Sequence, residues 1–170
     1  IIADAIAAFI EKIGLEPGLV KRNTPLPYAL AEVDAPGCTM CRACVFVCPS
    51  HAFKLDEEKQ TLEFKYIACV ACGMCEKACP EHVITLQRDL FLDRGALEYQ
   101  VVVQDEMVGC INCGKKYINR RALETIESRV FGIKDFFEYT FAGKRRDLLR
   151  MCPDCRGAMA VLEMQEGWEP

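Results

Sequence analysis

Two copies of one cysteine spacing occupy the middle of this 170-residue chain. In each copy, three cysteines stand three positions apart, a fourth follows after three intervening residues, and a proline comes next. The copies are Cys38, Cys41, Cys44, Cys48 and Pro49, then Cys69, Cys72, Cys75, Cys79 and Pro80. A disulfide framework would not repeat this register, and a zinc site does not need cysteines so tightly spaced. The repeat therefore predicts a fold built around metal clusters.

The pattern C-x2-C-x2-C-x3-C-P resembles the run that holds [4Fe–4S] clusters in bacterial ferredoxins. Three thiolates of one run can close on three irons of a cube, while the cysteine before the proline reaches the other cube. We therefore expect two [4Fe–4S] clusters with exchanged fourth ligands. The first would use Cys38, Cys41, Cys44 and Cys79, and the second Cys48, Cys69, Cys72 and Cys75.

The remaining four of the twelve cysteines form two C-x2-C pairs, Cys110 with Cys113 and Cys152 with Cys155. They look like two zinc knuckles, and four thiolates would satisfy a structural, tetrahedral zinc with no open position. With Tyr117 in place, the pattern also resembles that of rubredoxin, which binds a single iron. A third iron–sulfur cluster would use the same ligands, and a dithiol or empty site is the remaining alternative. The 38 residues between the pairs predict a helical insertion, which favours zinc over rubredoxin-type iron.

Charge and composition narrow the class of protein. The formal net charge is −4, and two clusters with a four-thiolate zinc would lower it to about −10. This argues against nucleic-acid binding and suits docking on a basic patch of a redox partner. The basic residues of the C-terminal part are expected to form a solvated face. They are Lys115, Lys116, Arg120, Arg121, Lys144, Arg145, Arg146 and Arg150.

The sequence shows no secretory signal peptide and no apolar run of about 18 residues, so we expect no membrane span. Metal-binding thiols belong in a reducing compartment, which predicts a cytoplasmic location. The chain begins with Ile1 rather than methionine, which suggests a fragment of a longer protein or a processed product.

The expected fold class is α+β, with three parts: an N-terminal helix and linker (1–27), a dicluster ferredoxin domain with short antiparallel strands (28–94), and a small helical zinc-ribbon-like domain (95–170). Strands are predicted at 28–33, 52–55, 61–64, 83–86 and 97–103, with 28–33 pairing with 83–86 and a hairpin joining 52–55 to 61–64. Helices are predicted at 2–13, 120–130, 135–141, 145–151 and 158–165. Apolar residues, among them Phe46, Val70, Met74, Val83 and Ile84, are expected to line the clusters.

The stretch from Leu30 to Arg156 resembles the C-terminal part of large bacterial multi-cluster ferredoxin proteins. The resemblance rests on the ferredoxin runs and on Cys110-Ile-Asn-Cys113-Gly114-Lys115 followed by Met151-Cys152-Pro-Asp-Cys155-Arg156. Such proteins often occur beside molybdenum-dependent formate dehydrogenases and their maturation factors. The resemblance implies an electron-transfer or assembly role near such an enzyme.

No nucleotide-binding loop and no nucleophile–base arrangement is visible, so we expect no small-molecule substrate and no catalytic activity of the chain's own. The leading hypothesis is an electron-transfer component that serves a redox protein or a larger oxidoreductase complex. The alternative is a non-enzymatic maturation, assembly or docking factor for a metalloenzyme such as formate dehydrogenase. Reversible reduction by dithionite would distinguish the two.

Overall fold

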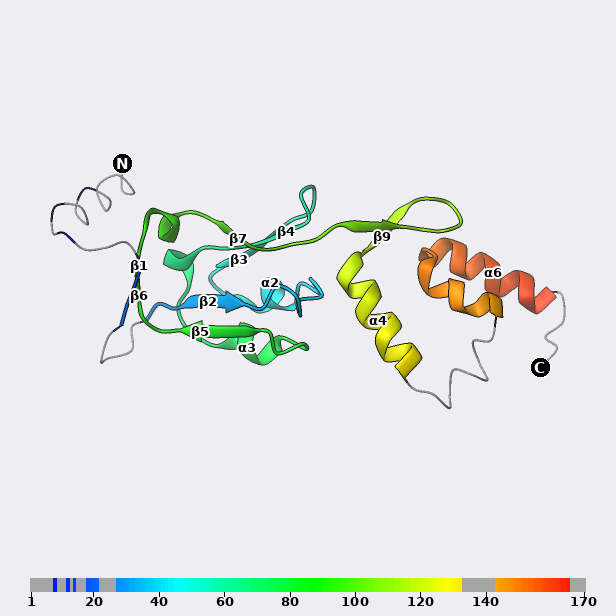
Figure 1. Ribbon diagram of the computed structural model, residues 1–170, viewed down its shortest axis with the longest axis horizontal. Coiled ribbons are helices and arrows are strands. Elements are labelled where there is room, and N and C mark those ends of the chain that lie inside the picture. The colour runs from blue at the N-terminus through cyan, green and yellow to red at the C-terminus, as the bar shows by residue number, and fades with distance from the viewer. Residues whose placement is uncertain are drawn as a thin grey trace. The chain divides into compact units, whose positions relative to one another are not determined.

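A computed structural model describes residues 27–132 and 143–165, together with residues 18–21 and positions 8, 12 and 14. The helix predicted over 135–141 lies outside the described residues, as does all but positions 8 and 12 of the helix predicted over 2–13. The chain divides into two compact units, Ile1–Gln104 and Asp105–Pro170. Each unit combines short helices with antiparallel strands (Figure 1), which confirms the α+β class.

In the first unit, two strands close the cysteine repeat at its ends. Strand β2 (Leu30–Val33) precedes the first cysteine run, and β5 (Ile84–Gln87) follows the second. They pair antiparallel from Leu30 opposite Gln87 to Val33 opposite Ile84. Strands β3 (Phe53–Asp56) and β4 (Thr61–Phe64) form the hairpin between the runs. Both pairings confirm the predictions from sequence.

Strand β7 (Gln100–Gln104) joins the hairpin as a third strand, paired antiparallel with β4 and carrying a register shift at Leu62 and Glu63. The first unit therefore extends to Gln104, beyond the boundary expected near residue 95. Its apolar Val103 explains this placement, because that side chain is fully buried in the core of the first unit. Gly18–Val20, expected within a linker, forms strand β1 and pairs with β6 (Leu90–Leu92).

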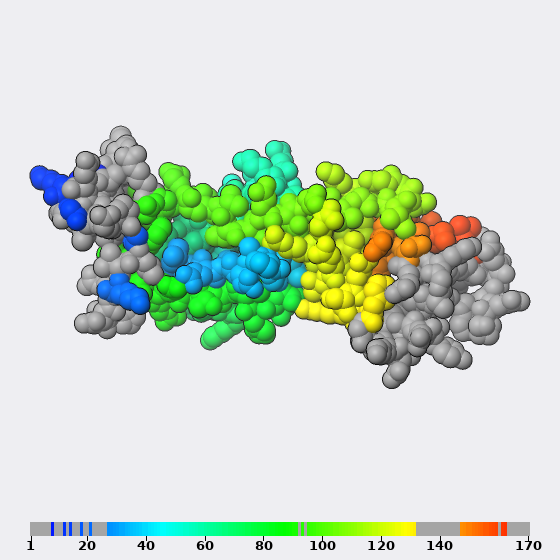
Figure 2. Space-filling model, viewed as in Figure 1, coloured from blue at the N-terminus to red at the C-terminus, as the bar shows by residue number. Residues whose placement is uncertain are grey.

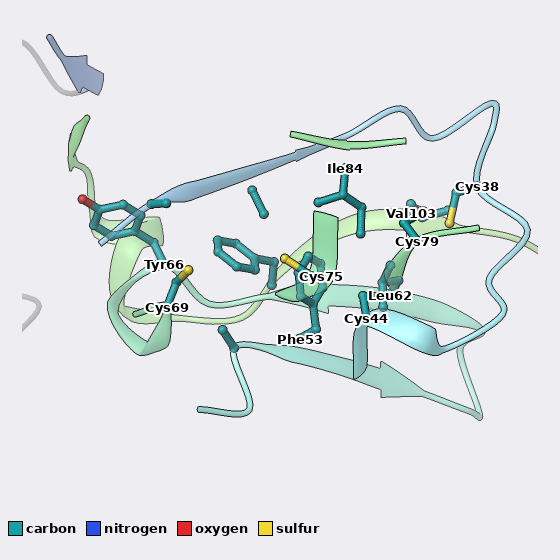
Figure 3. Packing of buried hydrophobic residues seen from close by; sticks show 14 of the residues in the cluster. Cys38, Cys44, Phe53, Leu62, Tyr66, Cys69, Cys75, Cys79, Ile84 and Val103 are labelled. Atoms are coloured by element: carbon teal, nitrogen blue, oxygen red, sulfur yellow. The ribbon is translucent and has the colours of Figure 1, made fainter. Parts of the chain in front are cut away.

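The cysteine runs end in two short helices, α2 (Ala43–Val47) and α3 (Met74–Ala78). Between them and the strands lies a core of aromatic and aliphatic side chains, interleaved with buried cysteines (Figure 3). The rings of Phe53 and Phe64 pack at a tilt of 52°, with their centroids 4.9 Å apart. The buried Tyr66, on the 3-10 turn η1 (Tyr66–Ala68), donates its hydroxyl to the Asp89 carbonyl, and the same hydroxyl accepts from the Phe91 N–H. A second 3-10 turn, η2 (Arg94–Leu97), leads into β7.

The second unit holds a β-hairpin followed by helices. Strands β8 (Met107–Gly109) and β9 (Lys116–Asn119) form the hairpin. Helix α4 (Arg120–Gly132) confirms the helix predicted at 120–130 and continues two residues further. The segment predicted as helical at 145–151 is the 3-10 helix η3 (Gly143–Arg150). Helix α6 (Pro153–Gln165) begins five residues before the predicted start at 158, because proline suits the first position of a helix.

Backbone strain repeats with the same 31-residue offset as the cysteines. Positive φ angles occur at Met40 and Ala71 (52° and 51°), at Arg42 and Gly73 (69° and 76°), and at His51 and His82 (53° and 55°). Such angles are costly for residues with a Cβ and persist where the surrounding structure enforces them. Where residues of right-handed and left-handed conformation alternate, their N–H groups point into one concavity, which suits negative charge. These six positions therefore lie within the two cysteine runs or just after them, whereas Gln60, which also has a positive φ of 53°, lies in the β3–β4 turn.

The pair Arg42 and Gly73 permits a direct test of this strain, because both residues precede a helix with nearly the same φ and ψ. Arg42→Gly should raise the free energy of unfolding by about 1 kcal/mol relative to Arg42→Ala, since both variants lose the exposed Glu57 ion pair but only glycine relieves the strain. Gly73→Ala should lower the free energy of unfolding by a similar amount. Guanidinium unfolding under anaerobic conditions measures both effects. Equal stability of the two Arg42 variants would contradict the strain argument.

Candidate metal centres

Four cysteines from both repeats surround one cavity in the first unit. Cys38 and Cys41 come from the loop before α2, Cys44 from α2 itself, and Cys79 from the residue after α3. The space free of atoms in this cavity is about 400 Å³, which includes its mouth open to solvent. Figure 3 shows Cys38, Cys44 and Cys79 on the side of Leu62 and Val103. Apart from the cysteines, the lining residues are Thr39, Met40, Arg42, Ala43, Leu55, Leu62, Glu81, Val83 and Ile84.

The other four cysteines surround a second cavity, with about 290 Å³ free of atoms. Cys69 and Cys72 come from the second loop, Cys75 from α3, and Cys48 from the residue after α2. The other lining residues are Ser50, Ala52, Phe53, Val70, Gly73, Met74 and Leu86. The structure thus brings together the two cysteine sets expected from sequence, each with three cysteines from one repeat and one from the other.

The two cavities are related by the repeat. Adding 31 to the residue numbers of the first loop gives the second loop, and subtracting 31 from Cys79, Glu81, Val83 and Ile84 gives Cys48, Ser50, Ala52 and Phe53. Equivalent positions therefore line both cavities. This correspondence makes any difference between two equivalent side chains a difference between the two sites.

Burial and mutual crowding set the proton affinity of these thiols. Burial, together with the neighbouring Cys38 and Cys41, raises the pKa of Cys44 to about 12. Burial likewise raises the pKa of Cys75 to about 11 and that of Cys69 above its usual value. Several buried thiolates can share a cavity only with a compensating cation. The donor set therefore fits a cationic iron core, whose binding would release the protons.

Cys48 differs from the other thiols of its cavity. Burial alone would raise its pKa, but the Phe53 N–H and other donors on the Ser50–Phe53 turn outweigh burial and lower it. The Ala52 N–H lies 3.2 Å from the Cys48 Sγ, and the Ser50 Oγ lies 3.7 Å from it. In the first cavity, the Met40 N–H donates to the Cys38 Sγ over 3.4 Å. Backbone and hydroxyl donors therefore already point at ligand sulfurs.

The second loop is held from outside by charged side chains. The Glu76 Oε1 accepts from the Leu86 N–H at 2.7 Å and so ties α3 to β5. The Arg88 guanidinium donates to the Ala71 carbonyl at 3.2 Å, within the loop between Cys69 and Cys72. These contacts were not expected from sequence, because no local motif identifies a carboxylate that caps a strand N–H. Together they fix the loop that carries three cysteines of the second cavity.

Some apolar residues expected beside the clusters lie elsewhere. Val83 and Ile84 line the first cavity and Val70 and Met74 the second, as predicted. Phe46 instead is 81% exposed and lines a separate groove with Val45 and Tyr99. In the space-filling view, the light-blue segment with the first cysteine run reaches the surface of its unit (Figure 2). The prediction for Phe46 was wrong, because the short helix α2 cannot bury the side chains on both of its faces.

A third group of thiols lies in the second unit. The sulfur atoms of Cys110, Cys113, Cys152 and Cys155 all lie within 4.8 Å of one another. Cys110 and Cys113 belong to the turn of the β8–β9 hairpin, whereas Cys152 precedes α6 and Cys155 lies in its first turn. In the hairpin turn, Gly114 has φ 74°, and a Cβ on Gly109 would stand 3.1 Å from the Gly114 carbonyl oxygen. Glycine at both positions therefore lets the turn close around the thiols.

Polar contacts connect the two cysteine pairs of this group. The Asn112 amide donates to the Cys155 Sγ at 3.3 Å, and the Cys113 and Cys152 sulfurs are 3.7 Å apart. Lys115 forms an ion pair with Asp154 at 2.9 Å. A zinc ion with four bonds of about 2.3 Å would place its sulfurs about 3.8 Å apart. The four thiols therefore fit one tetrahedral metal ion.

The thiols of this group differ in pKa. Burial would raise the pKa of Cys110, but the backbone N–H groups of Cys152 and Cys113 lower it to about 6. For Cys155, the Asn112 amide lowers the pKa, whereas proton sharing with the neighbouring thiols raises it to about 12. A single bound metal ion removes this conflict, because it stabilises all four thiolates together.

Several basic residues of the second unit have acidic partners. Besides Lys115, Arg120 pairs with Glu106 at 2.6 Å and Arg150 with Glu127 at 2.7 Å. These pairs match the solvated, charge-balanced face that was expected. Among the described residues, no helix is both long and apolar enough to cross a membrane.

Comparison with known families bears on the first unit. Residues 37–83 match the family of 4Fe–4S dicluster domains. The chain therefore contains a 4Fe–4S dicluster domain, and the match spans the eight cysteines of both cavities. No curated protein matches the chain. The matched segment covers less than half of the chain and lies within the first unit.

Proposed function

We propose that this chain is an electron-transfer iron–sulfur protein that passes single electrons to or from a larger oxidoreductase. The observation that carries the proposal is the pair of repeat-related cavities, each lined by four cysteines, within a 4Fe–4S dicluster domain. Each [4Fe–4S] cluster, when bound, accepts and releases one electron. The chain supplies the thiolate ligands, the N–H donors to sulfur and the apolar walls that exclude water.

The proposed ligands of the first cluster are Cys38, Cys41, Cys44 and Cys79, and those of the second are Cys48, Cys69, Cys72 and Cys75. This exchange has a mechanical consequence, because each cluster joins the two repeats. Loss of either cluster would then loosen both halves. The twelve cysteines are all free thiols in the structure, which supports a reducing compartment and hence the cytoplasm.

The partner is proposed to be a redox protein or an oxidoreductase complex rather than a nucleic acid or a membrane. The acidic net charge of −4 supports a partner with a basic surface. Reversible reduction by dithionite, followed by reoxidation without loss of iron, tests the electron-transfer role. Clusters that take up no electrons at low potential would contradict it.

The exchanged ligation can be tested with a matched pair of variants. Cys48→Ser should perturb the EPR spectrum of the cluster that uses Cys69, Cys72 and Cys75, although Cys48 belongs to the first run. Cys79→Ser should perturb the other cluster, because serine is a poorer ligand for iron than thiolate. EPR of the singly reduced proteins separates the effects. If Cys48→Ser gives the same spectrum as Cys41→Ser rather than Cys72→Ser, the assignment is wrong.

For the second unit, we propose a structural zinc ion held by Cys110, Cys113, Cys152 and Cys155. Support comes from the convergence of four sulfurs within 4.8 Å and from the absence of a vacant ligand position in a four-thiolate set. Helix α4 and the 3-10 helix η3 lie between the two cysteine pairs, unlike the short, irregular chain expected of a rubredoxin. The zinc would brace this unit and take no part in electron transfer.

Metal analysis tests the zinc proposal. Two clusters and one zinc predict an iron-to-zinc ratio of about 8:1 in anaerobically purified protein. Cys152→Ser should abolish zinc and expose residues 110–155 to protease, while the visible absorbance of the clusters stays almost unchanged, because the two units use separate ligands. The matched control is Ser128→Ala, which touches no thiol. About nine irons without zinc would indicate a mononuclear iron site, and about twelve a third cluster.

A further inference from the structure

The repeat places different side chains at one equivalent position of the two cavities. Ser50 follows Cys48 by two residues and lines the second cavity, whereas Glu81 follows Cys79 by two residues and lines the first. The Ser50 Oγ lies 3.7 Å from the Cys48 Sγ. A coordinated cysteine is a thiolate, so the hydroxyl must be the donor of this contact. A carboxylate at position 81 has no proton to donate and brings negative charge instead.

We propose that Ser50 and Glu81 make the two clusters unequal, so that the cluster on Cys48, Cys69, Cys72 and Cys75 has the higher reduction potential. This inference rests on the two-cluster function proposed above. Hydrogen bonds to the ligand sulfurs and the local charge are established determinants of the potential of an iron–sulfur cluster. Reduction adds negative charge, which a donor to sulfur stabilises and a neighbouring carboxylate opposes.

A backbone donor reaches a ligand sulfur of each cavity. The Ala52 N–H lies 3.2 Å from the Cys48 Sγ in the second, and the Met40 N–H lies 3.4 Å from the Cys38 Sγ in the first. The Ser50 hydroxyl is therefore the additional donor of the second cavity. Arg42 also lines the first cavity, but its guanidinium is bound by the Glu57 carboxylate at 2.5 Å, which offsets its charge. The residues that line the second cavity include no charged side chain except the cysteines themselves. Beside the second loop, Arg88 and Glu76 carry opposite charges, so these two side chains offset each other there.

Unequal reduction potentials would favour electron transfer in one direction. With both clusters bound, the residues around Cys48 would stabilise the added electron more strongly than those around Cys79, so the singly reduced protein would hold its electron on the cluster of the second cavity. Transfer between the clusters would oxidise one and reduce the other by one electron, with no proton or bond change in the chain.

EPR-monitored potentiometric titration of the anaerobically reconstituted full chain tests the proposal. Ser50→Ala should lower the higher of the two potentials, while Ser50→Thr, which keeps a hydroxyl, should preserve it. Glu81→Gln should raise the lower potential and leave the higher one in place. Each shift is expected to approach a tenfold change in the reduced-to-oxidised ratio at fixed potential, about 59 mV for one electron. The exposed Glu58→Gln, on the β3–β4 turn, controls for a change in net charge.

The double exchange Ser50→Glu with Glu81→Ser should reverse the order of the two clusters. The proposal is overturned if Ser50→Ala moves only the lower potential, if Glu81→Gln acts no more strongly than Glu58→Gln, or if neither variant shifts a potential. Iron analysis and the presence of two EPR signals are measured on the same samples. Their absence from the unmutated protein would contradict the two-cluster function itself, whereas two signals with unshifted potentials would contradict only the roles of Ser50 and Glu81.

Discussion

Crowding of buried thiols is the constraint on which the first unit depends. Four cysteine side chains converge on each cavity, and burial raises the pKa of Cys44 and Cys75 far above the usual value of a thiol. The exchange of Cys48 and Cys79 between repeats means that neither half can complete its cavity alone. The proposed metal binding in this unit would therefore be coupled to the association of the two repeats, in the way that metal binding often supplies folding free energy.

The loops accept backbone strain to achieve this convergence. Positive φ angles recur at three pairs of equivalent positions, and five of these six residues are not glycine. Strain of this kind is held in place by the surrounding structure, here by the β2–β5 pair, the aromatic core and the contacts of Glu76 and Arg88. Ser50 and Glu81 occupy equivalent positions of the repeat, but their side chains differ in charge. A duplicated fold thereby provides two sites with equivalent cysteine positions and different electrostatic character.

The sequence predicted the repeat and the strand pairing well, because cysteine spacing and alternating apolar residues are local signals, and the cysteines that it grouped together line the same cavities. It placed β7 in the wrong unit, since a strand's sequence indicates its conformation but not the partner against which Val103 will be buried. It missed the contacts of Glu76, Arg88 and Asn112, which join residues 10 to 43 positions apart. Comparison of equivalent repeat positions would have revealed the Ser50 and Glu81 difference, because it requires only the 31-residue offset.

The residues around the thiols differ between the two units, and this difference supports separate roles for the two proposed kinds of metal site. In the first unit, apolar side chains such as Leu55, Leu62 and Leu86 separate the cavities from water, which is the environment that controls a redox potential. One thiol of each set is exposed, namely Cys41, Cys72 and Cys113, so exposure does not distinguish the three sets. In the second unit, the thiols are braced by polar contacts from Asn112 and from the Lys115–Asp154 pair. A redox centre gains from a shielded, tuned cavity, whereas a structural ion needs only complete coordination and firmly joined ligands. The arrangement of the second unit therefore suits a brace, and the electron path is best sought within the dicluster domain.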